Sequence, residues 1–249
     1  MLRVQNIRKD FGGIKAVDGC SFEVARGKIT ALIGPNGAGK TTMFNIITGF
    51  MKQDTGNIIF KGEDITPLPD YKRCRLGLSR TFQSIRLFPK MTVMENMLVA
   101  MHSNESILQA LFMAGEMRAQ ERKLAEDARE ILRFVSLDTK ANELAGNLSY
   151  GQQKLLEIAK ALASEPEVLM LDEPAAGVNP TMLNKIRELM LKLKKKGRTI
   201  IFIEHNMEFV MGVADKVVVM DYGKEIAYDV PEKVQKNKRV IDAYLGVEE

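Results

Sequence analysis

Four short and almost wholly apolar runs divide the chain, and each is followed by glycine, acidic or other polar residues. Such runs are typical of strands that are buried on both faces of a parallel sheet. Between them, apolar residues recur at helical spacing. Strands that alternate with helices predict an α/β fold. The predicted strands are 29–33, 168–171, 199–203 and 217–220, and the predicted helices are 40–48, 149–163 and 181–196.

The remaining segments near the N-terminus alternate short strand-like runs with turns. Residues 25–28, Ala-Arg-Gly-Lys, read as a hairpin turn that leads into the strand at Ile29. Residues 56–60 and 76–82 predict two further strands. At the other end, Pro231 suits the first turn of a closing helix that runs to about residue 245.

Residues 92–147 have a different, helical character and predict an insertion of about fifty residues into the α/β chain. Thr92 and Glu95 form a capping-box pair for a helix that ends near residue 101. A second helical stretch covers about 105–135. Its apolar residues at 111–113 belong either to a core or to a docking surface.

Residues 34–42, Gly-Pro-Asn-Gly-Ala-Gly-Lys-Thr-Thr, match the phosphate-loop pattern G-x-x-x-x-G-K-[ST] between a predicted strand and a predicted helix. Glycines let successive backbone N–H groups turn inward as a nest for phosphate oxygens, and the helix start adds positive charge. Lys40 supplies a full charge to the outer phosphates, and the Thr41 hydroxyl is a magnesium ligand. The loop predicts binding of a nucleoside triphosphate through Gly34, Asn36, Gly37, Ala38, Gly39, Lys40, Thr41 and Thr42.

A second helix start with anion-binding character lies far along the chain, in Leu148-Ser149-Tyr150-Gly151-Gln152. Ser149 and Gln152 form another capping-box pair, so a helix begins here with backbone donors and a small hydroxyl at its tip. An ordinary well-capped helix explains the same residues equally well on local grounds.

Two adjacent carboxylates, Asp172 and Glu173, end the predicted strand 168–171, and His205 follows the strand 199–203. Buried carboxylates need a partner, and in a phosphate-loop protein the partner of Asp172 is Mg²⁺. Glu173 is then available to orient or deprotonate a water molecule. Because ligands bind beyond the carboxyl ends of parallel strands, we expect Lys40, Asp172, Glu173 and His205 to share one site.

Two residues are ambiguous from their surroundings. Phe11 lies in the polar turn Lys-Asp-Phe-Gly-Gly of residues 9–13, where it either stacks on a purine base or joins the core. Gln83 follows the predicted strand 76–82, a place where a glutamine is usually a solvated loop residue.

Composition and charge narrow the classes of partner. A net charge of +4, from 36 basic and 32 acidic residues, is too small and too dispersed to favour nucleic acid. The two cysteines, Cys20 and Cys74, have no metal-like spacing and favour a reducing, cytosolic setting. The N-terminus reads as strand rather than signal peptide, and no apolar run approaches the length of a membrane span. We therefore expect any membrane role to depend on partner proteins.

Taken together and in this order, these motifs resemble the nucleotide-binding subunit of an ATP-binding cassette (ABC) transporter. The resemblance identifies residues 34–42 as the phosphate loop, Gln83 as the Q-loop, 148–152 as the family signature, 168–173 as Walker B with its following glutamate, and His205 as the switch histidine. It implies a P-loop NTPase (RecA-like) core with an N-terminal antiparallel β subdomain, formed by 1–91 and 160–249. It also implies an inserted helical subdomain at about 92–159.

A closer resemblance is carried by Arg80-Thr81-Phe82-Gln83, by Arg86-Leu87-Phe88, by residues 174–180 and by Ile203-Glu204-His205-Asn206-Met207. With the helical insertion, these segments are similar to the larger ATPase, the LivG type, of branched-chain amino-acid importers. Amide and urea importers have similar ATPases, so the residues leave the solute open.

The family resemblance implies a mechanism in which two ATPase chains, identical or sister subunits, pack head to tail. Ser149, Gly151 and Gln152 of one chain then cover the ATP that the other chain holds with Lys40, Phe11 and Val17. Glu173, His205, Lys40 and Gln83 serve catalysis, and Thr41, Gln83 and Asp172 serve Mg²⁺. The implied partners are transmembrane permease subunits and, indirectly, a solute-binding protein, which places the chain on the inner face of the cell membrane.

Two departures from the common family pattern stand out. Tyr150 replaces the usual glycine of the signature, which is tolerable if its side chain points away from the nucleotide. Residues 176–179, Ala-Gly-Val-Asn, replace Ser-Ala-Leu-Asp in the D-loop, so Asn179 retains hydrogen bonding without charge.

Two other functions remain open: a non-transport ABC ATPase in translation or DNA repair, and a non-enzymatic nucleotide-gated adaptor. Non-transport ABC ATPases usually have two cassettes or a coiled-coil insertion, whereas this sequence has one cassette and no coiled-coil insertion. The intact Asp172-Glu173 pair argues against the adaptor, because an adaptor would not need catalytic carboxylates.

Overall fold

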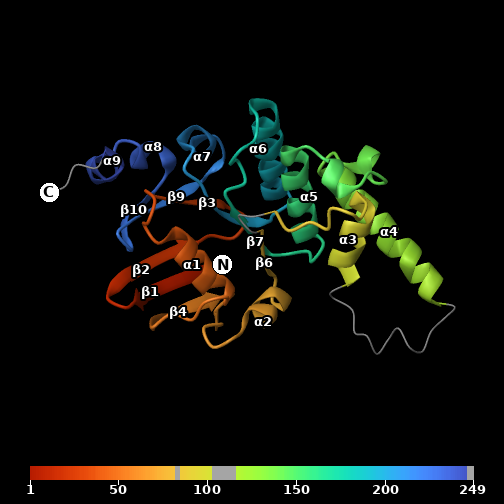
Figure 1. The fold of residues 1–249 in the computed structure, drawn as a ribbon. Coiled ribbons are helices and arrows are strands. Elements are labelled where there is room, and N and C mark those ends of the chain that lie inside the picture. Colours follow the sequence, from red (N-terminus) through yellow and green to blue (C-terminus); the bar gives the residue numbers. More distant parts are fainter. Residues whose placement is uncertain (82–84, 103–115, 246–249) are drawn as a thin grey trace. The chain divides into compact units, whose positions relative to one another are not determined.

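A computed structural model of the chain describes residues 1–81, 85–102 and 116–245 (Figure 1). By contacts, the chain divides into two compact units. The first contains Met1–Arg80, Glu167–Ala176 and Leu183–Glu249, and the second contains Thr81–Pro166 and Gly177–Met182. Each unit is described separately below.

The first unit is built on a six-stranded sheet with the order β10-β9-β3-β8-β7-β6. The central strands β3 (Ile29–Ile33), β8 (Thr199–Ile203) and β7 (Val168–Asp172) run parallel and are buried at every position. This burial confirms the prediction drawn from their unbroken apolar runs. Three further strands complete the sheet: β6 (Leu78–Arg80) is parallel to β7, β9 (Lys216–Asp221) is parallel to β3, and β10 (Lys224–Asp229) is antiparallel to β9.

A second, antiparallel sheet has the order β2-β1-β4-β5, with β1 (Leu2–Phe11), β2 (Ile14–Val24), β4 (Thr55–Phe60) and β5 (Glu63–Asp64). The hairpin turn predicted at 25–28 is wrong. β2 pairs with β1, whereas β3 lies between β8 and β9 in the other sheet, so residues 25–28 carry the chain from one sheet to the other. Local turn residues cannot show this, because a wholly buried strand takes its partners from distant segments.

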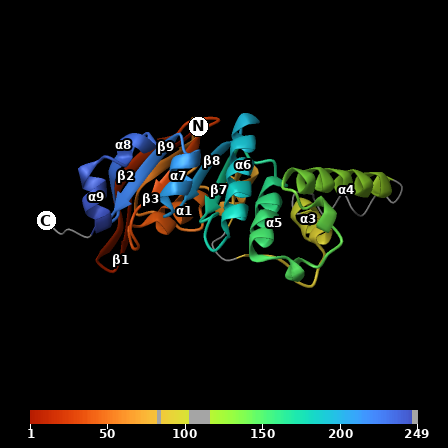
Figure 2. The ribbon, with the colours of Figure 1, turned by 90° about the horizontal axis from the view of Figure 1, so that it is seen from above.

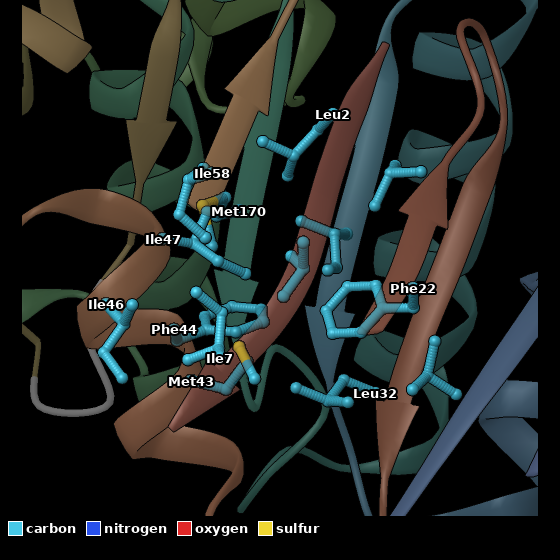
Figure 3. Close-up of a cluster of buried hydrophobic side chains, with 14 of the residues drawn as sticks. Leu2, Ile7, Phe22, Leu32, Met43, Phe44, Ile46, Ile47, Ile58 and Met170 are labelled. Carbon is cyan, nitrogen blue, oxygen red and sulfur yellow. The ribbon is translucent and has the colours of Figure 1, made fainter. Parts of the chain in front are cut away.

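The phosphate-loop helix α1 (Lys40–Thr48) packs between the two sheets. In Figure 3 its apolar residues lie among side chains of β1, β2 and β4 and of the parallel strands β3 and β7. The labelled members of this core are Leu2, Ile7, Phe22, Leu32, Met43, Phe44, Ile46, Ile47, Ile58 and Met170, each at most 5% exposed. This packing fixes the helix whose first turn carries Lys40 and Thr41.

The far end of α1 is bound by a buried arginine from α2 (Asp70–Arg75). Arg73, 2% exposed, donates from Nη1 to the carbonyls of Ile46 and Ile47 at 2.7 and 2.8 Å. Its Nε and Nη2 donate to the carbonyls of Leu68 and Thr66 at 2.9 and 2.8 Å. A cation at the C-terminal end of a helix complements the helix dipole, and the Ile46 and Ile47 carbonyls lie in the last turn, where helix carbonyls lack their usual partners. The Ile46 carbonyl also accepts from the Gly49 N–H at 3.2 Å.

We expect Arg73→Lys to lower the free energy of unfolding by about 1–3 kcal/mol, because lysine retains the charge but not the planar set of donors that serves four carbonyls. Urea unfolding followed by circular dichroism measures the change. Arg75→Lys, at an exposed position of the same helix, is the matched control and should stay within about 0.5 kcal/mol of wild type. Equal losses in both variants would contradict the anchoring role.

The rest of the first unit consists of helices around the sheets: α6 (Pro180–Lys195), most of which belongs here, α7 (Met207–Val213), α8 (Pro231–Val234) and α9 (Lys238–Leu245). Figure 2 shows α8 and α9 next to each other, and both helices contact β10. Pro231 occupies the first turn of α8 as predicted, but the single closing helix is two helices, because the chain turns at residues 235–237.

The second unit is helical: α3 (Val93–His102), α4 (Glu116–Phe134), α5 (Tyr150–Leu162) and two short 3₁₀ segments, Asp138–Lys140 and Ala145–Asn147. The Thr92–Glu95 capping box is present: the Glu95 backbone N–H donates to Thr92 Oγ1 at 3.1 Å, and the Thr92 N–H donates to Glu95 Oε2 at 2.7 Å. The predicted start of the second helix and its apolar residues 111–113 lie outside the described residues. Among the helices that are described, none is long and apolar enough to cross a membrane.

Candidate functional site

The phosphate loop connects β3 to α1 and has the backbone that an anion nest requires. Gly34, Gly37 and Gly39 have φ values of 149°, 82° and 95°, where residues with side chains are strained. The Lys40 ammonium donates to the carbonyls of Gly34 and Pro35 at 2.8 Å each. Burial lowers the pKa of Lys40, and the nearby Glu173 carboxylate opposes that shift. The loop therefore already places its lysine across its own concave side.

Two of these glycines also permit close approach of other backbones. A Cβ on Gly34 would lie 2.0 Å from the carbonyl oxygen of Met220, and one on Gly39 would lie 2.1 Å from that of Ala16. A Cβ on Gly37 would meet no protein atom within 4 Å. Gly34 and Gly39 hold the loop against β9 and β2, while Gly37 has no such close neighbour.

We expect Gly39→Ala to weaken ATP binding by about tenfold or more, because the new Cβ strains the backbone and displaces the Ala16 carbonyl. Titration with a fluorescent ATP analogue measures this. Gly62→Ala is the matched control: its φ of 92° is nearly the same, but a Cβ there meets no atom within 4 Å. Unchanged affinity in the Gly39 variant would show that the loop does not depend on this contact.

The carboxyl ends of β7 and β8 bring the predicted catalytic groups together. Asp172 pairs in register with Ile203, so Glu173 and His205 follow neighbouring strand ends. His205 Nδ1 lies 3.8 Å from Glu173 Oε1. Glu173 has a φ of 48°, in a left-handed region that costs a non-glycine residue about 1–3 kcal/mol. Strain of this kind is typical of functional positions.

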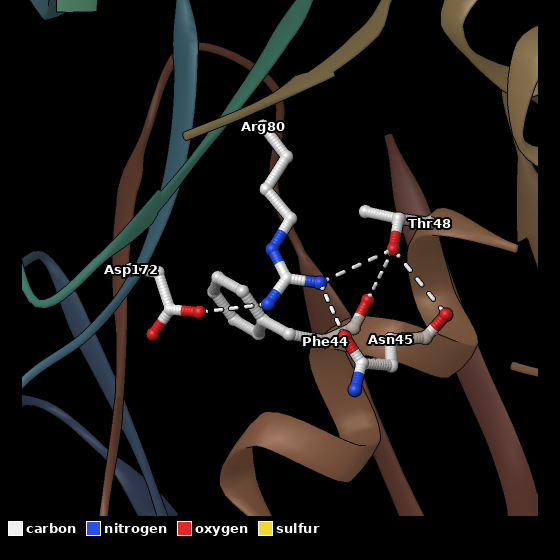
Figure 4. Close-up of polar contacts among 5 residues, drawn as sticks. All are labelled: Phe44, Asn45, Thr48, Arg80 and Asp172. Carbon is white, nitrogen blue, oxygen red and sulfur yellow. Dashed lines mark hydrogen bonds and ion pairs between the residues drawn. The ribbon is translucent and has the colours of Figure 1, made fainter. Parts of the chain in front are cut away.

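Asp172 is buried and paired with Arg80 (Figure 4). Arg80 Nη2 donates to Asp172 Oδ2 at 2.7 Å, and Nη1 donates to Asn45 Oδ1 at 2.6 Å. The Arg80 guanidinium also lies over the Phe44 ring, 5.5 Å from its centre. Arg80 thus connects Walker B to α1 and supplies the opposite charge that a buried carboxylate needs.

A second buried carboxylate, Glu204, follows β8 directly and is 0% exposed. Its oxygens accept from the backbone N–H groups of Ala175, His205 and Asn206. Burial raises the pKa of Glu204, and the three N–H donors and His205 act in the opposite direction.

In the second unit, Ser149 caps α5 as predicted: the Gln152 N–H donates to Ser149 Oγ at 3.4 Å, and the Ser149 N–H donates to Gln152 Oε1 at 2.9 Å. Gly151 is buried, and a Cβ there would lie 2.5 Å from Cγ of Met182. The Tyr150 ring lies over Gly177: a Cβ on Gly177 would be 3.0 Å from Cε1 of Tyr150. The two departures from the family pattern therefore contact each other.

The oxygen donors of this region fit a magnesium ion. Thr41 offers a hydroxyl from the exposed first turn of α1, and Asp172 offers a carboxylate. Mg²⁺ usually takes one or two protein oxygens, with water and substrate phosphates completing its shell. The described residues contain no group of three or more His, Cys, Asp or Glu side chains that could hold a metal ion.

The other predicted binding residues have different surroundings. Phe11 ends β1 and is 44% exposed beside Lys9, so it does not join the core. Val17 is 1% exposed and belongs to the core cluster, on the β2 segment that approaches Gly39. Gln83 lies outside the described residues.

Arg80 and Glu204 were not predicted from the sequence as residues of this site. Both stand in segments that carry the family resemblance, but nothing in their immediate sequence marks a role. The signal for Glu204 is the one that identified Asp172: a carboxylate directly after a wholly apolar strand needs buried partners. For Arg80, only the three-dimensional pairing with Asp172 provides a signal.

Comparison with known families and proteins agrees with this geometry. The family described as "ABC transporter" matches residues 17–176, which contain the phosphate loop, the signature and Walker B. A second family, described as "Branched-chain amino acid ATP-binding cassette transporter", matches residues 224–249.

Full-length relatives and solved structures extend the match. The chain is 44% identical to the high-affinity branched-chain amino acid transport ATP-binding protein BraF of Pseudomonas aeruginosa, and 41% identical to LivG of Escherichia coli K12. Both matches cover 99% of this chain and 98% of the relative.

A nucleotide-free ATP-binding cassette from an ABC transporter superposes with a TM-score of 0.87 at 38% identity, covering 100% of this chain and 99% of that one. The ADP conformation of MJ1267, an ATP-binding cassette of an ABC transporter, gives a TM-score of 0.86 at 39% identity, covering 99% of this chain and 98% of that one. The chain has a phosphate loop, a signature and Walker B in this order, and its relatives match it over almost its whole length. It therefore belongs to the ABC transporter family and has the ATPase fold of that family.

Proposed function

We propose that this chain is the ATPase subunit of an importer for branched-chain amino acids. The observation that carries the proposal is the shared edge of the parallel sheet, where Lys40, Asp172, Glu173 and His205 follow neighbouring strands. The solute class is supported by the names of the BraF and LivG relatives and by the match of residues 224–249.

In this proposal the residues of the site bind ATP, hold Mg²⁺ or take part in hydrolysis. The loop N–H groups and Lys40 bind the β- and γ-phosphates of ATP, and Phe11 stacks on the base. Thr41 and Asp172, with Gln83, hold Mg²⁺, which neutralises charge on the phosphates when it is bound. Glu173 orients and deprotonates the attacking water. His205, whose Nδ1 lies 3.8 Å from Glu173 Oε1, steadies the γ-phosphate.

We further propose that the chain works as half of a dimer. The capped start of α5 is a second anion-binding helix end, and Ser149 and Gly151 would cover the γ-phosphate bound to a neighbouring chain. Gln152 closes the capping box and thereby holds the Ser149 backbone in position at the start of α5. ATP then lies between two subunits and holds them together.

The partners follow from the same proposal. An importer ATPase of this kind acts on permease subunits, to which Gln83 and the helical unit would couple the state of the nucleotide. The ATPase would sit peripherally on the inner face of the cell membrane. A solute-binding protein would act indirectly, through the permease.

Co-purification tests the proposal. The tagged chain, extracted from detergent-solubilised membranes of its own source, should bring down permease subunits and hydrolyse ATP. The complex in proteoliposomes should then import leucine, isoleucine or valine in an ATP-dependent way. Import of an amide or urea instead would correct the solute class, and recovery without membrane subunits would overturn the importer assignment.

A further inference from the structure

Glu204 joins the two loops of the site through one buried carboxylate. Oε1 accepts from the Ala175 N–H at 2.7 Å, on the loop after β7. Oε2 accepts from the N–H groups of His205 and Asn206 at 3.1 and 3.4 Å, on the loop after β8. Each oxygen therefore serves a different loop.

These loops carry the two groups assigned above to hydrolysis. Ala175 lies two residues beyond Glu173, whose own N–H donates to the Ile203 carbonyl at 3.1 Å. His205 follows Glu204 directly. The carboxylate of Glu204 thus ties together the backbones on both sides of the 3.8 Å gap between His205 Nδ1 and Glu173 Oε1.

The chemistry of the contacts calls for a glutamate. All three partners are donors, and an ionised carboxylate offers two acceptor oxygens and no donor. A glutamine of the same shape has to direct its NH₂ group at one of the loops, where it meets an N–H instead of an acceptor. An aspartate retains the charge but is one methylene shorter, so it cannot reach both loops at once.

We propose that Glu204 is a positioning residue for ATP hydrolysis, which sets the distance and orientation between Glu173 and His205. This inference rests on the proposed catalytic roles of those two residues. Because a displacement of about 1 Å can cost up to about a hundredfold in rate, loosening one loop should affect turnover far more than nucleotide binding.

The test is a double-mutant cycle with the full chain. Glu204→Gln should lower kcat by about tenfold or more, while KM for ATP and the affinity for a fluorescent ATP analogue change less than about twofold. Glu204→Asp should lower kcat in the same way. In a Glu173→Gln background the second change, Glu204→Gln, should have almost no additional effect, because residues that act as a unit are not additive.

Asp215→Asn is the matched control. Asp215 also accepts a backbone N–H, from Ile29 at 2.9 Å, and also joins two strands, but at the amino ends of β9 and β3. The Asp215→Asn variant should lose about as much thermal stability as the Glu204 variants, but it should retain the wild-type kcat. Thermal unfolding measured for every variant separates loss of fold from loss of positioning, and Glu204→Asp serves if the glutamine variant does not fold.

The outcomes are distinct. An unchanged kcat in both Glu204 variants would overturn the positioning role and leave the proposed function intact. Equal fractional losses from Glu204→Gln with and without Glu173 would also overturn it, because the effect would then be general destabilisation. A normal rate for Glu173→Gln alone would instead undermine the catalytic assignments of the proposed function.

Discussion

Glu173→Gln should slow ATP hydrolysis by about 10²–10⁴-fold, the usual cost of losing a general base, while ATP still binds. Glutamine has the same shape and the same left-handed backbone to accommodate, so the fold and the φ of 48° should be retained. What is lost is the carboxylate that faces His205 from a neighbouring strand end. Phosphate release measures the rate, and titration with a fluorescent ATP analogue measures binding.

The same variant should accumulate as a dimer when ATP is present, because ATP that is not hydrolysed continues to hold two chains together. Size-exclusion chromatography with and without ATP shows this directly. Glu188→Gln, on the exposed face of α6, is the matched control and should hydrolyse ATP at the wild-type rate. A Glu173 variant with normal turnover would remove this residue from catalysis.

Arg80→Met should lower the free energy of unfolding by about 3–5 kcal/mol, the largest stability change expected here. The two charged side chains are 6% and 3% exposed, and removal of the arginine takes away the counter-charge that lies 2.7 Å from the buried Asp172 carboxylate. Denaturant unfolding in the presence of EDTA, without nucleotide, measures the effect with no contribution from Mg²⁺.

Two further variants make that measurement specific. Arg3→Met breaks an exposed pair, Arg3 with Glu23, and should cost less than about 1 kcal/mol. The double variant Arg80→Met, Asp172→Leu replaces both buried charges by apolar groups and should be more stable than Arg80→Met alone. If the double variant gains nothing, the loss of the arginine's charge beside Asp172 is not the cause of the lower stability.

Much of the fold could be predicted from the sequence, because its main signals are local. The apolar runs of β3, β7 and β8 required burial on both faces, and the capping boxes at Thr92 and Ser149 fixed two helix starts. The phosphate loop was recognisable because backbone conformation, and hence glycine spacing, determines how it binds. The alignment of Asp172, Glu173 and His205 followed from the common direction of parallel strands.

Other features depend on partners that are distant in sequence. The turn at 25–28 has the residues of a hairpin, but the pairing of β3 with β8 and β9 decides its path. Arg80 and Asp172 lie 92 positions apart, and Glu204 Oε1 reaches Ala175, 29 positions away. No periodicity or local motif encodes such pairs, which appear only once the sheet brings them together.

The contact between Tyr150 and Gly177 has a consequence for chimeric proteins. In a cassette with a bulkier D-loop residue at the position of Gly177 the tyrosine ring has to move, since even a methyl group there would lie 3.0 Å from Cε1 of the ring. When this signature segment is placed in a relative, the chimera should keep its activity only if the D-loop glycine is exchanged with it. The signature and the D-loop should therefore be exchanged together as one unit.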